Sequence, residues 1–458
     1  MIEIVSVETP SLGDRSYLAT DGSVAIMVDP QRDIDRVMAL ADRRGVRITG
    51  VFETHIHNDY VTGGLALAQA VGAAYYLNAA DHVGFTRIGI TDGDVIETGE
   101  IRVHAVATPG HTFTHLSYAL EDSGLVIAVF TGGSLLNGST GRTDLLGAEH
   151  TVTLARAQHR SAQRLAAEMP AEAKVCPTHG FGSFCSATPT SGAASTIGME
   201  RTVNPALTLA ETDYVESMLA ALDAYPAYYA HMAPANAAGP PAPDLREPQP
   251  ASSGELRRRI EAGEWVVDLR ARIAFAGGHV RGTLAFEFGD LMTTYLGWLI
   301  PWGAPLTLLG ETPDQVAQAQ RELARIWADR PAAAASGGPP RWAAGTPLAS
   351  VRLAKFADLA VAMAAAAAQP VVLDVRRRLE WAESHIAGAR HIPLYELSGR
   401  AGELPPGEVW VHCQSGYRSI VAASLLAGRG RQVVNVDDDF GNAAAAGLPL
   451  QPARAGRP

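Results

Sequence analysis

An internal repeat in the second half of the chain restricts its fold more than any other feature. Three short segments recur about a hundred residues apart, as expected of two tandem modules. The matched segments are Val266–Arg270 with Val372–Arg376, Gly278–Gly282 with Ser384–Gly388, and Ala344–Leu348 with Ala446–Leu450. In both copies strand-like and helix-like patterns alternate, which is typical of a parallel α/β sheet. The repeat therefore predicts two α/β modules, over residues 254–350 and 351–458.

A stretch rich in Pro, Ala and Gly separates these modules from the first half of the chain. Residues 234–253 lack apolar periodicity, which predicts a linker. Upstream, residues 1–233 predict another α/β domain. Apolar spacing there indicates a helix from Ile34 that stops at Gly45. Predicted strands cover residues 48–52, 101–107, 125–130 and 174–176. Each runs into a loop that contains His, Thr or Gly, and this favours a site at the strand ends.

Composition excludes several classes of function. A net charge of −11 over 458 residues disfavours nucleic acid and anionic membranes as partners. Only three cysteines are present, Cys176, Cys185 and Cys413, and their wide spacing indicates a reducing cytoplasm rather than a disulfide framework. The N-terminus lacks the basic and apolar regions of a signal peptide. We expect a cytoplasmic protein.

The run from Cys413 to Arg418, with sequence CQSGYR, predicts a reactive thiol. A short Gly-containing loop that opens a helix directs backbone N–H groups at the sulfur. The helix would begin at Tyr417 and end at Gly428. Its N-terminal dipole and Arg418 both favour the thiolate, which is the nucleophilic form. The remaining active-loop residues are Gln414, Ser415, Gly416, Tyr417 and Ser419.

With four residues between Cys and Arg, this loop resembles the active loop of rhodaneses. The Asp, Arg and His residues shared by the two copies also fit the rhodanese signature. The resemblance implies that Cys413 carries a sulfane sulfur and that Arg418 assists an anionic donor or acceptor, such as thiosulfate or sulfite. By position Gly310 replaces the cysteine in the first copy. That copy is therefore expected to be inactive, and to serve as a structural element or as an interface in a homo-oligomer.

Histidines with the spacing of metal ligands occur in the first half. His55 and His57 follow a predicted strand, Asp59 comes two residues later, and His111 and His179 lie in later loops. Imidazoles and a carboxylate at one loop can close on a single ion. The spacing predicts a metal site formed by His55, His57 and His111, with Asp59 and His179 as further candidates.

This pattern resembles the metallo-β-lactamase superfamily, which implies an αββα sandwich over residues 1–233. The run from Phe130 to Gly132 and the later Arg142 resemble persulfide dioxygenases most. The resemblance implies a non-haem iron held by two His and one Asp, with His55 and His111 as the two histidines. It also implies that Arg142 binds the thiol-bearing substrate.

Two positions depart from that pattern. Gly133 stands where the family has its metal-binding Asp, and Tyr60 stands where a second-site His is usual. A dinuclear site needs both groups, so we expect one mononuclear ion, with Fe(II) favoured over zinc. Cys185, six residues after His179, is a candidate thiol relay, although a small apolar filler fits it as well.

The sequence therefore predicts an enzyme that oxidises a low-molecular-weight thiol persulfide to sulfite and transfers sulfur through Cys413. Two alternatives stay open. One is a hydrolase of a thioester or similar substrate. The other is a metal-free N-terminal domain that binds persulfides and supplies them to Cys413.

Overall fold

The computed structural model describes the whole chain except residues 191, 366–369 and 452–458. The chain divides into two compact units. The first comprises Met1–Asp244 and Arg321–Asp329, and the second comprises Leu245–Gln320 and Arg330–Pro458. None of the helices among the described residues is long and apolar enough to cross a membrane.

The first unit contains two six-stranded sheets. One sheet has the order β1-β2-β3-β4-β5-β6, with strands Glu3–Thr9, Asp14–Thr20, Val24–Val28, Arg47–Phe52, Ala74–Asn78 and Ile88–Ile90. The other has the order β12-β11-β10-β9-β8-β7, with strands Ser195–Thr196, Lys174–Pro177, Leu125–Gly132, Leu116–Asp122, Ile101–Ala107 and Val95–Thr98. Buried side chains of both sheets, among them Ile26, Phe52, Tyr118 and Phe130, form one apolar core between them.

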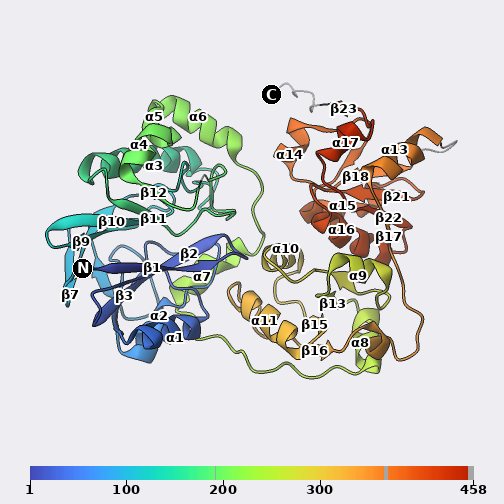
Figure 1. The fold of residues 1–458 in the computed structure, drawn as a ribbon, viewed down its shortest axis with the longest axis horizontal. Coiled ribbons are helices and arrows are strands. Elements are labelled where there is room, and N and C mark those ends of the chain that lie inside the picture. Colours follow the sequence, from blue (N-terminus) through green and yellow to red (C-terminus); the bar gives the residue numbers. More distant parts are fainter. Residues whose placement is uncertain (191, 366–369, 452–458) are drawn as a thin grey trace. The chain divides into compact units, whose positions relative to one another are not determined.

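Helices cover the outer face of each sheet, which completes four layers, helix, sheet, sheet and helix (Figure 1). Helices α1 (Ile34–Arg44) and α2 (Gly64–Val71) pack on the first sheet. Four helices cover the second sheet, namely α3 (Thr151–Glu168), α4 (Ile197–Val203), α5 (Pro205–Thr208) and α6 (Glu211–Ala221). Helix α7 (Tyr229–Ala238) comes next in the chain. The predicted αββα sandwich is confirmed.

Local predictions in this unit also agree with the structure. Helix α1 begins at Ile34, and Gly45 ends it with φ 66°, a left-handed conformation that glycine adopts without steric cost. The predicted strands correspond to β4, β8, β10 and β11. Strands β4, β8 and β11 end in the loops that carry the candidate metal ligands.

The second unit contains two parallel sheets, one in each copy of the repeat, while residues 321–329 of the predicted first module group with the first unit. The first sheet has the order β14-β13-β15-β16, with strands Leu284–Ala285, Trp265–Asp268, Leu306–Gly310 and Ala333–Ser336. The other has the order β17-β22-β21-β18-β20, with strands Arg352–Ala354, Val433–Val436, Val409–His412, Val371–Asp374 and Arg390–His391. A small antiparallel pair joins β19 (His385–Ile386) to β23 (Leu450–Gln451).

The two sheets share one strand order. Strands β14, β13, β15 and β16 take the places of β20, β18, β21 and β22. The fifth place, that of β17, is filled in the first copy by residues near Pro250, which bridges Ala334 in parallel. This part of the expected linker is therefore paired with the sheet, and Pro234 lies inside helix α7. The connection between the domains is shorter than composition alone predicts.

Helices alternate with the strands in both modules. The first carries α8 (Ser253–Glu261), α9 (Arg272–Gly277), α10 (Met292–Leu299), α11 (Pro313–Ala324) and α12 (Pro339–Ala343). The second carries α13 (Phe356–Ala365), α14 (Arg378–Glu383), α15 (Leu397–Arg400), α16 (Tyr417–Gly428) and α17 (Asn442–Ala445), with short 3-10 turns at Leu394–Glu396 and Ala401–Glu403. Helix α16 matches the predicted helix after Cys413.

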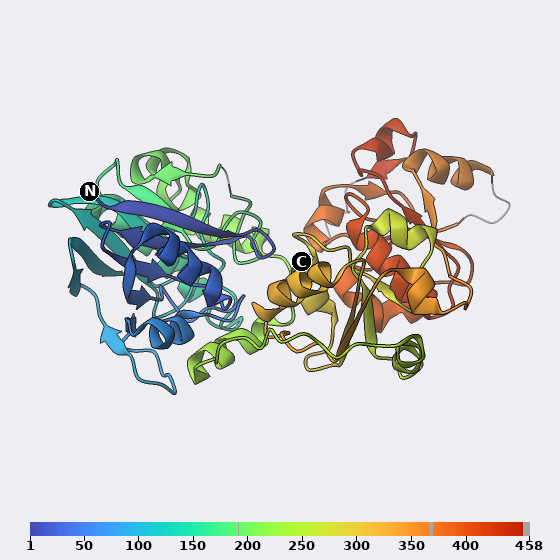
Figure 2. The same ribbon diagram turned by 60° about the horizontal axis from the view of Figure 1, so that its bottom comes forward.

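The two modules share a buried apolar cluster. Phe275 and Ala285 of the first module pack with Ile420 and Ala423 of helix α16. The hydroxyl of Ser424 also accepts a hydrogen bond from the Ala285 amide, over 3.1 Å. Figure 2 shows the two modules, yellow to orange and orange to red, side by side within this unit. Helix α16, which follows the Cys413 loop, therefore packs against the first module as well as within its own module.

Candidate functional site

The loop after strand β4 brings histidines into the interior of the first unit. His55, His111 and His179 are all fully buried, and one nitrogen of each lies within 4.8 Å of the others. Two further groups could hold an ion, namely His57 with Asp59 and His179, and Asp29 with Glu53 and His57. Of the predicted residues, His55, His111 and His179 form the all-histidine group, whereas His57 groups with carboxylates.

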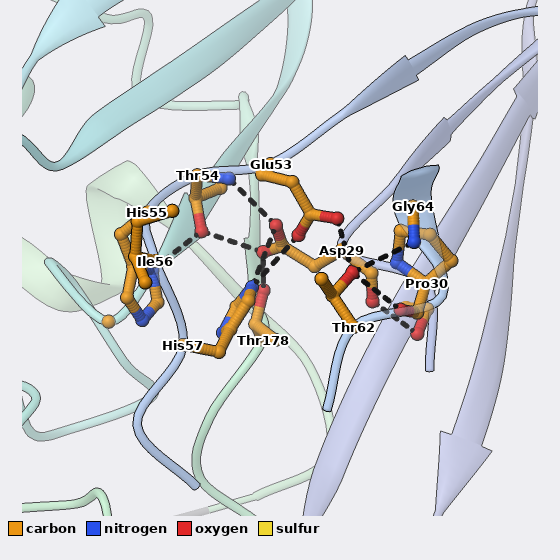
Figure 3. Close-up of polar contacts among 12 residues, drawn as sticks. Asp29, Pro30, Glu53, Thr54, His55, Ile56, His57, Thr62, Gly64 and Thr178 are labelled. Atoms are coloured by element: carbon orange, nitrogen blue, oxygen red, sulfur yellow. Dashed lines mark hydrogen bonds and ion pairs between the residues drawn. The ribbon is translucent and has the colours of Figure 1, made fainter. Parts of the chain in front are cut away.

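His57 faces carboxylates with one of its nitrogens. Its Nε2 atom lies 3.2 Å from Asp29 Oδ1 and 3.2 Å from Glu53 Oε2 (Figure 3). Burial lowers the pKa of His57, but these two carboxylates outweigh burial and raise it to about 9. Tyr60 completes the contact, since its hydroxyl lies 3.0 Å from the same nitrogen. Tyr60 thus supports His57.

Asp29 connects the loop to the rest of the site. Its carboxylate accepts hydrogen bonds from the Thr54 amide and the Thr54 hydroxyl, each over 2.7 Å, and from the Thr178 hydroxyl (Figure 3). Burial alone would raise the pKa of Asp29, but His57 and these donors keep it lowered. The sequence prediction missed both Asp29 and Glu53. Each lies directly after a buried strand, and an acidic residue at such a position is the pattern by which the sequence indicates a site residue.

Asp14, at the start of β2, is another residue that the sequence prediction missed. It is buried, and its Oδ1 atom lies 3.0 Å from His179 Nδ1, while Asp59 Oδ2 lies 3.1 Å from the same nitrogen. Burial and the Asp59 charge raise the pKa of Asp14 to about 7. Burial opposes a charge on His179, but Asp59 and Asp14 raise its pKa to about 10. No pattern in the sequence links Asp14 to His179, because 165 residues separate them.

Gly133 lies against the ring of His111. A Cβ atom added there would lie 2.3 Å from His111 Cδ2. The left-handed conformation in this turn belongs to Gly132, with φ 51°, and not to Gly133. The space that a side chain would need at Gly133 is therefore taken by a histidine.

Arg142 is held by its own neighbours. It forms a two-pronged ion pair with Asp144, over 2.7 Å for both bonds, and donates to the carbonyls of Phe184 and Asp223. Its exposed fraction is 3%. Cys185 is completely buried beside this site, and burial together with Asp59 raises the pKa of its thiol. A protonated thiol is a poor nucleophile.

The Cys413 loop follows strand β21 in the second unit. The Gly416 amide donates a hydrogen bond to Cys413 Sγ over 3.2 Å, and Ser419 Oγ lies 3.6 Å from the sulfur. Gly416 adopts φ 96°, and a Cβ there would lie 2.0 Å from Asp437 Oδ1. The loop thus needs glycine both for its turn and for its packing.

Arg418 is paired with Glu380 of helix α14. Two hydrogen bonds of 2.6 and 2.7 Å join them. Burial alone would raise the pKa of Glu380, but Arg418 lowers it to about 2. The arginine charge beside the sulfur is therefore largely offset by a carboxylate, which the sequence prediction did not include.

Strand register relates the first module to the second. Asp374 pairs with His412, the residue before Cys413, and Asp268 pairs with Leu309, the residue before Gly310. Gly310 therefore occupies the place that Cys413 has in the second module. Both modules also repeat an Asp–Arg pair, with Arg270 on Asp268 and Arg376 on Asp374.

Comparisons with known proteins agree with both halves of this description. Residues 15–179 match the metallo-beta-lactamase superfamily, and residues 357–445 match the rhodanese-like domain. Human mitochondrial persulfide dioxygenase ETHE1 is 29% identical over 220 residues, which cover 48% of this chain and 78% of that protein.

A hydroxyacylglutathione hydrolase from Cereibacter sphaeroides is 32% identical over 186 residues, which cover 39% of this chain and 67% of that protein. A solved metallo-beta-lactamase from Staphylococcus aureus subsp. aureus COL is 25% identical, with a TM-score of 0.66 over 73% of this chain and 98% of that one. The chain belongs to the metallo-beta-lactamase superfamily and carries a rhodanese-like domain near its C-terminal end.

Proposed function

We propose that this protein oxidises a low-molecular-weight thiol persulfide in its first unit and transfers sulfane sulfur through Cys413 in its second. The observation that supports this most directly is the Gly416 amide, 3.2 Å from Cys413 Sγ in a loop that opens helix α16. Resemblance to a persulfide dioxygenase supports the first activity, and the rhodanese-like match supports the second.

Sulfur transfer at Cys413 would proceed in two displacements. The Cys413 thiolate attacks the outer sulfur of the donor, the donor S–S bond breaks, and the donor leaves as a thiolate or as sulfite. The new persulfide on Cys413 is then attacked at its outer sulfur by sulfite. Thiosulfate leaves, and the Cys413 thiolate is regenerated. The Gly416 amide stabilises negative charge on the sulfur in both steps.

Oxidation in the first unit would convert one persulfide, one dioxygen and one water into a thiol, sulfite and two protons. An ion such as Fe(II), held by buried histidines that include His55 and His111, would supply the dioxygen chemistry. The residues present fit such an ion, because His111 Nε2 is buried and has no hydrogen-bond partner among the described residues. Arg142, held in place by its pair with Asp144, would bind the thiol-bearing substrate.

The two activities suit each other chemically, since sulfite made by the first is an acceptor for the second. The first module, with Gly310 in place of a cysteine, would act as a structural partner of helix α16.

The Cys413→Ser variant tests the sulfurtransferase activity, with thiosulfate or an organic persulfide as donor. We expect transfer to be lost while the fold and persulfide-dependent oxygen consumption are retained. A matched Cys176→Ala variant should keep both activities, because Cys176 is an apolar core residue of the first unit and alanine adds no polar group there. Transfer that survives in Cys413→Ser would contradict the assignment.

A hydrolase of a thioester is the second candidate, and the similarity to a hydroxyacylglutathione hydrolase favours it. Gly133 and Tyr60 oppose it, because they remove groups that a two-metal site needs. Oxygen consumption with a glutathione persulfide, compared with hydrolysis of a glutathione thioester by the same metal-loaded protein, separates the two candidates.

A further inference from the structure

Each of the three clustered histidines has its Nδ1 atom engaged by an acceptor. His111 Nδ1 donates to the Arg142 carbonyl over 2.8 Å, and a carbonyl can only accept. His55 Nδ1 lies 2.9 Å from Thr54 Oγ1, whose single proton is already donated to Asp29. The Thr54 oxygen must therefore accept from His55. The Nδ1–H tautomer leaves the Nε2 lone pair of both rings available.

His179 completes the set. Its Nδ1 atom faces Asp14 Oδ1 at 3.0 Å and Asp59 Oδ2 at 3.1 Å, so it also carries its proton on Nδ1. Carboxylates that accept from the outer nitrogen of a metal-bound histidine fix its orientation and increase its basicity. Asp14 and Asp59 are placed to do this for His179.

Two of the inner nitrogens lie at a distance suited to one ion. His55 Nε2 and His179 Nε2 are 3.3 Å apart, within hydrogen-bond distance, so an ion that binds both nitrogens takes the place of a proton between them. Two nitrogens bound at about 2.1 Å to a tetrahedral ion lie about 3.4 Å apart. His111 Nε2 is buried and lacks a hydrogen-bond partner among the described residues, and an unsatisfied buried acceptor is costly unless a ligand occupies it.

A carboxylate from position 133 would not fit this arrangement. The ideal Cβ of Gly133 lies 2.3 Å from His111 Cδ2 and 2.6 Å from His111 Cγ. His57 turns its Nε2 atom to Asp29 and Glu53. Its Nδ1 atom is buried without a hydrogen-bond partner among the described residues, but the group of three histidines whose nitrogens lie within 4.8 Å of one another contains His179 and not His57. The geometry therefore differs both from a site with two histidines and one carboxylate and from the sequence-based trio with His57.

We propose that one divalent transition-metal ion binds to the Nε2 atoms of His55, His111 and His179, with Asp14 as the residue that positions His179. Such an all-nitrogen site carries no ligand charge, and it leaves positions open for a thiolate and a second small molecule. This inference extends the proposed oxidation. The chemistry that the ion supplies rests on that proposed function, but the binding of the ion does not.

Metal binding by the full-length protein tests the proposal without an activity assay. The protein is stripped with chelator and titrated with Co(II), whose visible absorption reports its ligands, and bound metal is counted by elemental analysis. We expect one ion per chain in the wild type. The His55→Ala, His111→Ala and His179→Ala variants should each bind at least about a hundredfold more weakly, and Asp14→Asn about tenfold more weakly.

Two controls make the outcome decisive. His104→Ala removes a histidine of the same unit that pairs with Glu121 on strand β9, and it should bind like the wild type. The His57→Ala variant should retain Co(II) with a Co(II) spectrum close to that of the wild type. Loss of binding in His57→Ala together with retention in His179→Ala would overturn the proposal.

X-ray absorption of the metal-loaded wild type provides a measurement that does not depend on any variant's folding. Three imidazoles around the ion are expected. Two imidazoles with a carboxylate, or no bound ion, would refute the trio. A protein that binds the ion through three imidazoles, loses it in His179→Ala and consumes no oxygen with persulfide would uphold this inference and overturn the proposed oxidation instead.

Discussion

The guanidinium of Arg418 donates two hydrogen bonds to the carboxylate of Glu380, over 2.6 and 2.7 Å, in the loop that holds Cys413. From the sequence, Arg418 was expected to offer its charge to the sulfur or to an anionic substrate. In the structure much of that charge is committed to a side chain 38 residues earlier in the chain. Arg418 therefore ties the Cys413 loop to helix α14.

Glu380→Gln should destabilise the second unit in a manner that depends on pH. Folding lowers the Glu380 pKa from 4.5 to about 2, so its stabilisation is complete above about pH 4.5 and is lost as pH falls toward 2. The shift corresponds to at most about 3 kcal/mol at neutral pH. Calorimetric unfolding at several pH values should show a gap between wild type and variant that closes in acid.

Glu383→Gln is the matched control, because Glu383 is an exposed residue at the end of the same helix. It should unfold like the wild type throughout. A gap between wild type and Glu380→Gln that stays constant from pH 7 to pH 2 would show that the ion pair is not its cause.

How far the sequence could predict this site depends on how local each contact is. The Cys413 loop was predictable because the sulfur, the glycine turn and the helix start all lie within seven residues. The repeat likewise predicted Gly310 as the counterpart of Cys413. Asp14 could not be found in this way, since its role depends on a contact with His179 across 165 residues. Long-range pairing of this kind leaves no periodic signal along the chain.

Gly133→Asp should weaken metal binding. The resemblance to persulfide dioxygenases read from the sequence implies the opposite, because it places a metal-binding Asp at this position. In the structure a Cβ at Gly133 lies 2.3 Å from the His111 ring, so any side chain must displace that ring. We expect Co(II) affinity to fall at least about tenfold, since small displacements of a binding group are costly.

Gly84→Ala is a suitable control in the same unit, because its added Cβ would meet no atom nearer than 3.5 Å. Its metal affinity should be that of the wild type. An increase in metal affinity in Gly133→Asp would show that the loop can open, and that Gly133 is a vacated ligand position after all.

Cys185→Ala should leave sulfur transfer within about twofold of the wild type, because a protonated thiol is a weak nucleophile. Cys185 is completely buried, and burial together with Asp59 raises the pKa of its thiol. Transfer rates with thiosulfate, measured beside Cys413→Ser, provide the check. A loss comparable to that in Cys413→Ser would establish Cys185 as a relay.

Gly416→Ala should disable sulfur transfer without unfolding the protein. The variant strains the loop twice. Gly416 has φ 96°, a conformation that residues with a Cβ rarely adopt, and the new methyl group would lie 2.0 Å from Asp437 Oδ1. Relief of this strain must move the Gly416 amide away from Cys413 Sγ, its partner at 3.2 Å.

Removal of one hydrogen bond to a developing anion lowers turnover about a hundredfold in comparable sites, and we expect a loss of at least tenfold here. Gly428→Ala is the matched control, because it lies at the other end of helix α16 and its Cβ would meet nothing within 4 Å. That variant should transfer sulfur at the wild-type rate. Equal activity in the two variants would mean that the Gly416 amide does not support the sulfur during transfer.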